Sequence, residues 1–496
     1  MSQPYILAID EGTSSTRSVI YDHQANVVAS VQKEFEQHYP QPGWVEHDPE
    51  EIWSAVVEVS NAVIQKAGIE AGDIAAIGIT NQRETTVAWD RQTGECLYNA
   101  IVWQDRRTAD VCEQLRGDGV ERDVIEKTGL RLDPYFSGTK IAWILNHVEG
   151  ARELADAGRL AIGTIDCFLI WRLTDGAVHA TDATNASRTL LFNIRTQAWD
   201  DDLLQLLNIP HSVLPDVRDC AADYGVAGSG HFGAPIPIRG VAGDQQSALI
   251  GQAGFEPGMS KSTYGTGCFV LTNTGDDAPI SENQLLTTVA SRLDGKVAYG
   301  LEGSVFVAGS AMQWLRDELQ LIDSAPESEA IAVATGVVED VVVVPAFTGL
   351  GAPYWDPYAR GAVFGLTRGS NRERIVTATL QAVALQTADL LSAMADDGVT
   401  PSVIRVDGGM VKNDWFLQFL ADILNTPVER PKDIESTVLG AAFLAGLDAG
   451  VFDSTDAVSE RWQQDALFEP QMADALREQL LAGWADAISR VRVNDT

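Results

Sequence analysis

Residues 10–17 are the first segment whose residue types could do chemistry: Asp and Glu are followed by Gly, four hydroxyl residues and Arg17. A carboxylate at the end of a strand can hold Mg²⁺, usually through water, while backbone amides and hydroxyls approach a phosphate. An ordinary hairpin turn rich in Gly and Ser is the alternative interpretation. The chain has no Gly-x-x-x-x-Gly-Lys-Ser/Thr motif, so a Walker-type phosphate loop is excluded.

Asp244 is a candidate catalytic base. It lies in the sequence Gly-Asp-Gln-Gln (243–246), directly after the apolar segment 236–242. A carboxylate in this place could accept the proton of a substrate hydroxyl during phosphoryl transfer, a reaction that depends mostly on positioning and electrostatics. A turn aspartate without a catalytic role is the alternative.

Paired glycines in segment 406–413 form a third candidate site. Gly408 and Gly409 follow an apolar strand, and glycine lets the backbone come close to a flat ligand such as adenine. The same residues would also make a simple tight turn.

A fourth group of polar and aromatic residues follows other apparent strands. Arg83 and Glu84 follow the apolar run 74–79, Trp103 follows 100–102, and Tyr135 precedes a helix-like segment. Ligands bind at the carboxyl ends of strands in α/β proteins. A donor and an acceptor suit vicinal hydroxyls, and the aromatic rings offer apolar faces to carbon atoms. The alternative for Arg83 and Glu84 is an exposed ion pair.

The elements that position these residues follow an α/β pattern. Strand-like runs flank a small-residue turn at 5–21 and again at 260–271, which predicts two similar β-hairpins. Strands are expected at 74–79 and 236–242, and helices at 49–66 and 141–154. The repeated hairpin predicts two related domains, 1–250 and 251–496, that face each other across a cleft.

Composition limits the possible partners. The 496 residues carry a net charge of -35, and eight of the 35 basic residues are lysine. Such a surface repels nucleic acid and anionic membranes. The N-terminus lacks the pattern of a signal peptide, and no run reads as apolar enough to span a bilayer, so a cytoplasmic protein is expected. Acidity with few lysines also predicts adaptation to high salt, against the alternative of a merely acidic enzyme.

Taken together, the motifs resemble the FGGY carbohydrate kinases from Ile6 to about Leu447. The most specific segments are 43–49, 78–85, 133–140, 243–246, 264–269 and 345–365. The resemblance implies two actin-like ATPase (ribonuclease H-like) domains with ATP and Mg²⁺ in the cleft. It also implies phosphorylation of glycerol to sn-glycerol 3-phosphate, the first step of glycerol catabolism.

The resemblance also implies a role for individual residues. Asp244 would be the general base, and Asp10 and Asp244 would face the metal. The glycerol pocket would comprise Arg83, Glu84, Trp103, Tyr135, Asp244, Gln245 and Phe269. Phosphate contacts would come from Thr13, Ser14, Ser15, Arg17, Thr266, Gly309 and Gln313, and adenosine contacts from Gly409 and Asn413.

Two departures and two alternatives remain. Glu11 stands where the family usually has Gln, and strand alternation predicts that it points away from Asp10 and the ligand. Arg374 also departs from the second family signature. The alternatives are a kinase of the same family acting on a ketose such as xylulose, and a nucleotide-driven switch or filament protein. A homodimer or homotetramer is expected, and the sequence does not decide between them.

Overall fold

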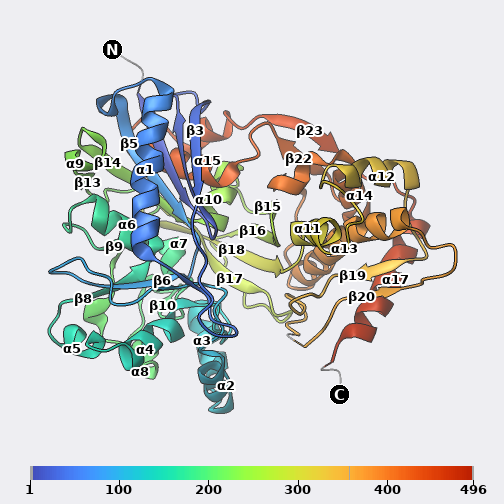
Figure 1. Ribbon diagram of the computed structural model, residues 1–496, viewed down its shortest axis with the longest axis horizontal. Helices are drawn as coiled ribbons and strands as arrows, with labels where there is room; N and C mark the ends of the chain where they lie inside the picture. Colours follow the sequence, from blue (N-terminus) through green and yellow to red (C-terminus); the bar gives the residue numbers. More distant parts are fainter. Residues whose placement is uncertain (1–3, 357, 494–496) are drawn as a thin grey trace.

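The protein contains two large β-sheets, one built mainly from each half of the chain (Figure 1). The structure is a computed structural model that describes residues 4–356 and 358–493. In the described part of the chain the first sheet has six strands, in the order β13 (Val226–Ala227), β14 (Ile236–Gly243), β5 (Ile74–Asn81), β1 (Tyr5–Glu11), β2 (Ser15–Tyr21) and β3 (Val27–Glu34).

The second sheet has seven strands within the described residues. Their order is β17 (Leu286–Leu293), β18 (Lys296–Val305), β16 (Cys268–Gly275), β15 (Met259–Tyr264), β21 (Val403–Asp407), β22 (Val428–Pro431) and β23 (Gln464–Phe468). Each sheet contains one of the predicted hairpins. β1 pairs with β2 and β15 with β16, both antiparallel, so both predicted hairpins are confirmed.

Alternating apolar side chains let the first sheet bury both faces. Leu7 and Ile9 pack in one core with α1 (Pro49–Ala67) and α6 (Ile165–Leu173), whereas Ile6 and Ala8 pack against α15 (Ser436–Asp448) in another. Helix α15 comes from the second half of the sequence. This helix crosses the predicted domain boundary near residue 250, so the division into domains 1–250 and 251–496 stays a prediction.

Helix α1 shows how local sequence fixes an element. Asp48 accepts a hydrogen bond from the Glu50 amide (2.8 Å), Pro49 occupies the first turn, and Gly68 ends the helix in the left-handed conformation (φ 68°). Side-chain capping, proline at the start and glycine at the end are the usual helix boundary signals. The predicted helix at 49–66 is confirmed.

Two helices, α10 (Asp244–Gly251) and α15, lie between the sheets and pack against each other. α15 contacts β14, β5 and β1, and α10 contacts β15, β16 and β17. Glycines on β5 and β14 make the close approach of α15 to the first sheet possible. A Cβ at Gly78 of β5 would lie 2.1 Å from the Ala441 carbonyl oxygen, and one at Gly240 of β14 would lie 2.4 Å from the Ala445 nitrogen.

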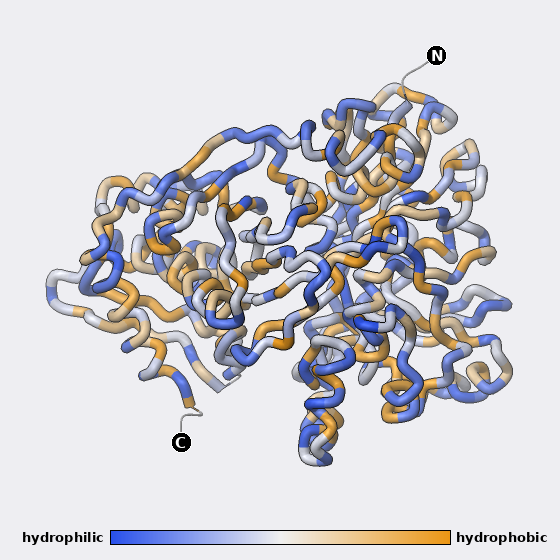
Figure 2. Tube along the Cα trace, turned by 180° about the vertical axis from the view of Figure 1, so that it is seen from behind, coloured by the Kyte–Doolittle hydropathy of each residue, from blue (hydrophilic) through white to orange (hydrophobic). Residues whose placement is uncertain are grey.

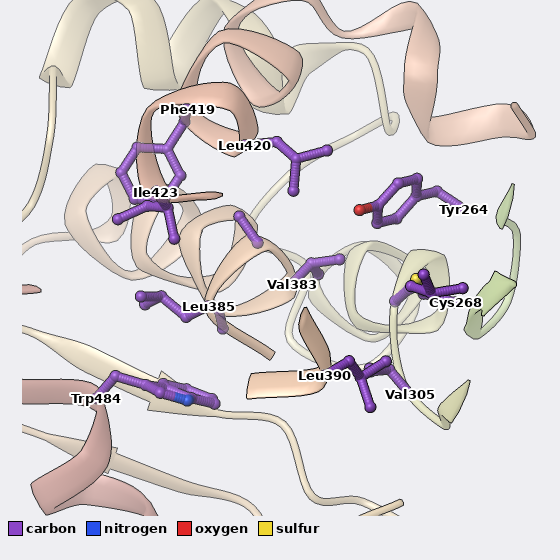
Figure 3. Close-up of a cluster of buried hydrophobic side chains, with 14 of the residues drawn as sticks. Tyr264, Cys268, Val305, Val383, Leu385, Leu390, Phe419, Leu420, Ile423 and Trp484 are labelled. Atoms are coloured by element: carbon purple, nitrogen blue, oxygen red, sulfur yellow. The ribbon is translucent and has the colours of Figure 1, made fainter. Parts of the chain in front are cut away.

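The second sheet packs against α13 (Arg372–Asp396), α14 (Asp414–Leu424) and α17 (Asp474–Val491). Figure 3 shows part of this core, which includes Val383 and Leu390 of α13, Leu420 of α14, Trp484 of α17 and strand residues such as Val305. By length and composition alone α13 could cross a membrane, contrary to the prediction that no segment is apolar enough. However, 72% of its apolar window is buried inside the protein, as expected of a core helix.

The remaining elements surround these sheets. α2 and α3 lie at the bottom of Figure 1, where α2 projects from the first half. The elements are β4 (Glu46–His47), β7 (Ala100–Ile101), β6 (Thr86–Asp90) and β8 (Leu160–Thr164), which form a smaller sheet, and α2 (Ala109–Gly117), α3 (Glu121–Thr128), α4 (Ser137–His147), α5 (Ala151–Asp156), β9 (Ala180–Asp182), α7 (Ala183–Ala186), β10 (Phe192–Asn193), β11 (Ala198–Trp199), α8 (Asp201–Leu206), β12 (Asp216–Arg218), α9 (Ser229–Phe232), α11 (Gly309–Asp317), α12 (Glu327–Thr335), β19 (Val342–Val344), β20 (Ala362–Phe364) and α16 (Thr455–Ser459).

One predicted helix was wrong. The segment 141–154 does not form one helix, because α4 ends at His147 and α5 begins at Ala151. Val148 is extended and Gly150 has a φ of 80°, and both conformations interrupt the hydrogen bonding of a helix. The apolar periodicity continues across the break, which is why the sequence pattern suggested a single element.

Candidate active site

Three parallel strands bring the predicted site residues to one edge of the first sheet. β14, β5 and β1 are neighbours, with Asp10 opposite Thr80 and Gly243 opposite Asn81. The carboxyl ends of parallel strands meet at the same edge, where α/β proteins bind ligands. Asp10, the Arg83–Glu84 pair and Asp244 therefore lie at one end of the sheet.

Arg83 is the central contact of this group. Its Nε lies 3.1 Å from Oδ1 of Asp244, and its Nη2 donates a hydrogen bond to the Tyr135 hydroxyl (3.4 Å). The absence of a side chain at Gly243 leaves room for Arg83, since a Cβ there would lie 2.7 Å from the arginine Cγ. Arg83 is only 2% exposed, so the alternative of an exposed ion pair is wrong.

A buried ring of charges surrounds Arg83. Glu84 pairs with Arg83 (3.9 Å) and with Arg188 (2.7 Å), and both arginines also contact Glu302. Sequence reasoning missed Arg188 and Glu302. The signal for Glu302 was an acidic residue inside a mostly apolar strand, which is rare unless the charge is paired.

Trp103 and Tyr135 form an aromatic wall beside the ring. Their ring centroids lie 5.5 Å apart at 65°, and the Trp103 indole N–H donates to Oγ1 of Thr13 (2.9 Å). Asp133 accepts from the Tyr135 amide (2.9 Å), and the ammonium group of the buried Lys140 donates to the Tyr135 carbonyl (2.5 Å), which fixes the loop before α4. The predicted hydroxyl pocket is therefore in direct contact with the β1–β2 hairpin, where phosphate contacts are predicted; this hairpin is called the first phosphate hairpin below.

Gln245 and Phe269 are joined through a lysine that the sequence did not suggest. The ammonium group of Lys261 on β15 donates to Oε1 of Gln245 and to the carbonyl of Phe269 (3.3 Å). Lys261 is fully buried, and burial lowers its pKa, although Asp407 and Asp244 oppose this. The sequence feature that could have identified Lys261 is a lysine inside a segment predicted to be a strand.

The first phosphate hairpin has the predicted small-residue tip. The Gly12 amide donates to the Ser15 carbonyl (3.0 Å), and Thr13 and Ser14 occupy the turn. Arg17 lies on β2, not in the turn as predicted, and contacts Glu435 and Gln32 (2.8 Å). Gln32 also donates to the Ser15 hydroxyl (2.8 Å). The positive charge of Arg17 is thus partly balanced by the carboxylate of Glu435.

The second hairpin is joined to the start of α11. The Thr266 carbonyl accepts hydrogen bonds from the amides of Ala308 (2.9 Å) and Ser310 (3.1 Å). Gly309 is required by close approach, since a Cβ there would lie 2.5 Å from the Gly265 carbonyl oxygen. Gln313 is exposed four residues further along α11, on the same helix face as Gly309.

The predicted adenosine segment adjoins this second hairpin. Gly408 has a φ of 91°, and a Cβ there would lie 2.6 Å from the Tyr264 carbonyl oxygen. Gly409 is exposed and has no neighbour where a Cβ would be, so space is open beside it. Asn413 caps α14 by accepting from the Phe416 amide (2.8 Å), which fixes its orientation.

Glu11 points into the protein, as strand alternation predicted. It is fully buried and accepts a hydrogen bond from the Thr16 hydroxyl, whereas Asp10 is partly exposed. Burial raises the pKa of Glu11 well above its usual range. The hydrogen bond from Thr16 opposes this rise, and the nearby Asp10 adds to it.

The carboxylates of Asp10 and Asp244 fit a magnesium ion that is also held by phosphates. Burial raises the pKa of Asp10 to about 7; Arg17 opposes this and the nearby Asp244 adds to it. The described residues form no group of three or more His, Cys, Asp or Glu side chains that could hold a metal alone. Mg²⁺ is commonly bound by one or two carboxylates together with substrate phosphates.

A separate shallow groove of about 780 Å³ is lined by Asp48, Cys96, Arg172 and their neighbours. It contains none of the predicted site residues. The hydrogen-bonded group around Arg83 is therefore the better candidate for chemistry.

Comparisons with known proteins agree with this geometry. Residues 5–251 match the N-terminal domain of the FGGY family of carbohydrate kinases, and residues 261–449 match its C-terminal domain. The chain is 58% identical to glycerol kinase 1 of Pseudomonas aeruginosa over 488 residues, which cover 98% of this chain and 99% of that protein.

Two solved structures are similar over nearly the whole chain. A Plasmodium falciparum glycerol kinase with ADP is 40% identical, with a TM-score of 0.93 and 99% of each chain covered. A ligand-bound xylulose kinase from Lactobacillus acidophilus is 25% identical, with a TM-score of 0.87 and 98% of each chain covered. These similarities confirm the predicted α/β fold of two actin-like ATPase domains.

Proposed function

Because the chain belongs to the FGGY family of carbohydrate kinases, we propose that it transfers the γ-phosphoryl group of ATP to glycerol and forms sn-glycerol 3-phosphate. In metabolism this would be the first step of glycerol catabolism. The similarity to glycerol kinases is much higher than the similarity to the xylulose kinase.

The observation that carries the proposal is the direct contact between the hydroxyl pocket and a phosphate hairpin. Trp103 donates to Thr13 of the hairpin and packs against Tyr135, which accepts a hydrogen bond from Arg83. Arg83 in turn contacts Asp244. The described residues of this group offer donors, acceptors and aromatic faces, and its arginine is paired with carboxylates, which suits a small uncharged polyol beside a phosphate site.

In the proposed mechanism Asp244 is the general base. Its carboxylate accepts the proton of a terminal glycerol hydroxyl as that oxygen forms a bond to the γ-phosphorus. The bond from the γ-phosphorus to the bridging oxygen breaks, and ADP leaves. Arg83 fixes one side of the Asp244 carboxylate, so the base is oriented before the substrate arrives. A positioned base typically contributes about 10² to 10⁴-fold to the rate.

Other residues would position the two substrates. Arg83 and Glu84 would hydrogen-bond glycerol hydroxyls, with Trp103, Tyr135 and Phe269 against its carbon atoms and Gln245 beside them. Mg²⁺ held by Asp10 and Asp244 would neutralise the developing charge on the phosphates. The phosphates would be bound by Thr13, Ser14, Ser15, Arg17, Thr266, Gly309 and Gln313, and the adenosine by Gly409 and Asn413.

The substrate assignment predicts a clear preference among polyols and ketoses. With ATP and Mg²⁺, kcat/KM for glycerol should exceed that for xylulose by roughly 10²-fold or more, because a pocket built around hydrogen bonds discriminates strongly. ADP release measured across both substrates, with no-substrate controls, gives this ratio. Equal or faster turnover of xylulose would contradict the glycerol assignment and favour the ketose alternative.

A salt dependence is also proposed from the charge of the chain. Hydrophilic segments occur over both halves of the molecule (Figure 2), and the net charge is -35. Repulsion between the acidic side chains acts over a Debye length of about 30 Å at 0.01 M salt and about 3 Å at 1 M salt. The unfolding temperature and the activity should therefore rise from dilute buffer into molar KCl. A midpoint that stays constant or falls would refute adaptation to high salt.

We expect the enzyme to act in the cytoplasm as a homodimer or homotetramer, with glycerol and ATP as its partners rather than nucleic acid or a membrane. Its net charge of -35 supports the exclusion of polyanions.

A further inference from the structure

Four buried charged side chains form a closed ring next to the candidate base. Glu84 contacts Arg83 (3.9 Å) and Arg188 (2.7 Å), and Glu302 contacts Arg188 (2.9 Å) and Arg83 (2.5 Å). Each of the four side chains is at most 2% exposed. Two cations and two anions balance within the ring, which lowers the cost of burying them.

The ring joins three separate parts of the chain. Arg83 and Glu84 follow β5, Arg188 follows α7, and Glu302 lies on β18 of the second sheet. Its backbone pairs with Leu271 on β16 and Leu286 on β17, so the position of Glu302 is fixed by strands on both sides. Glu302 therefore fixes Arg83 and Arg188 against the second sheet.

The contacts leave specific atoms free to meet a substrate. Both contacts of Glu84 use Oε1, and the described residues donate no hydrogen bond to its Oε2. Nη1 and Nη2 of Arg83 donate to Glu302, Nη2 also donates to the Tyr135 hydroxyl (3.4 Å), and Nε faces Asp244. Changing either outer member of the ring would reorient the residues that face the proposed glycerol pocket.

We propose that Arg188 and Glu302 are positioning residues for the polyol: Glu302 orients Arg83 against Asp244, and Arg188 orients Glu84 so that its free oxygen accepts a substrate hydroxyl. This inference rests on the proposed function. The electrostatics support it, because Arg188 and Arg83 hold the pKa of Glu302 at about 2, although burial alone would raise it. Glu302 is thus charged near neutral pH.

The first test is Glu302→Gln, which keeps the size of the side chain and removes its charge. KM for glycerol should rise about 10-fold or more, because small misplacements of substrate-binding groups cost that much or more. KM for ATP should stay within about twofold of the wild-type value, since the ion pairs of the four ring side chains do not involve the tips of the two hairpins, residues 12–14 and 265–267. Glu302→Asp, which restores the charge, should recover part of the loss.

The matched control is Glu46→Gln. Glu46 is also a buried carboxylate paired with an arginine, Arg107 (2.7 Å), but it lies in the smaller sheet. If the ring only stabilises the fold, both Gln variants should lose stability and leave KM for glycerol unchanged. A KM for glycerol within about twofold of wild type in Glu302→Gln would therefore overturn the proposal.

Arg188→Lys provides a second test if Glu302→Gln does not fold. It keeps the charge, but one ammonium group cannot replace the two guanidinium contacts to Glu84 and Glu302. A selective rise in KM for glycerol is expected, and an unchanged value would refute the role of Arg188. Wild-type enzyme that phosphorylates no glycerol would instead refute the proposed function, so the two failures are distinguishable.

Discussion

Asp244→Asn is expected to lower kcat for glycerol phosphorylation by about 10²-fold or more, because it removes the proposed base and one charge proposed to face the metal. The substitution keeps the size of the side chain at the start of α10. The Arg83 contact (3.1 Å) would lose its ion-pair character, but the ring that holds Arg83 would remain. The glycerol affinity should therefore change much less than kcat.

Steady-state kinetics and calorimetric titration with glycerol would separate the effect on kcat from the effect on glycerol affinity. Asp474→Asn is a suitable control, because Asp474 is also the first residue of a helix, α17, but is largely exposed and, among the described residues, forms an ion pair only with Arg477 in its own first turn. Its kcat should equal that of the wild type. An Asp244→Asn variant with nearly normal kcat would exclude Asp244 as the base.

Gly440→Ala should strongly destabilise the contact between α10 and α15. A Cβ at residue 440 would lie 1.8 Å from the Ser247 carbonyl oxygen, and one at Gly251 would lie 2.0 Å from the Ser436 carbonyl oxygen. Backbone atoms cannot rotate away as a side chain can, so the helices must separate. Overpacking of this kind costs up to about 3 kcal/mol and occasionally more.

Thermal unfolding measures this effect, with a midpoint expected several degrees below that of the wild type. Gly483→Ala is the control, because Gly483 lies inside α17 with no atom within 4 Å of its Cβ position. That variant should gain about 0.5 to 1 kcal/mol from helix propensity. If Gly440→Ala were as stable as the wild type, the close packing of these two helices would be wrong.

The sequence predicted the strands and turns at the candidate site better than the contacts between distant segments. Both hairpins, the strands before Arg83 and Asp244, and the inward side chain of Glu11 follow from apolar runs, turn residues and alternation. These are local signals, and the residues concerned lie within a few positions of them. The comparisons confirm the fold, whereas the roles of the site residues remain predictions.

What the sequence did not predict depends on contacts between distant segments. Glu302 is 219 positions from Arg83, and α15 returns from the second half of the chain to cover the first sheet. No local pattern specifies such pairings without a known fold. The break between α4 and α5 was missed for a different reason, since the apolar positions continue across Gly150 while the backbone does not.

The central claim is that this chain phosphorylates glycerol, and analysis of the product tests it most directly. Purified protein would be incubated with ATP, Mg²⁺ and glycerol, and the phosphorus spectrum and ADP release would be followed together. We expect one equivalent of sn-glycerol 3-phosphate per ADP and little ADP release without glycerol. ADP release that is independent of glycerol, with no phosphomonoester formed, would contradict phosphorylation of glycerol by this chain and indicate a nucleotide-driven switch.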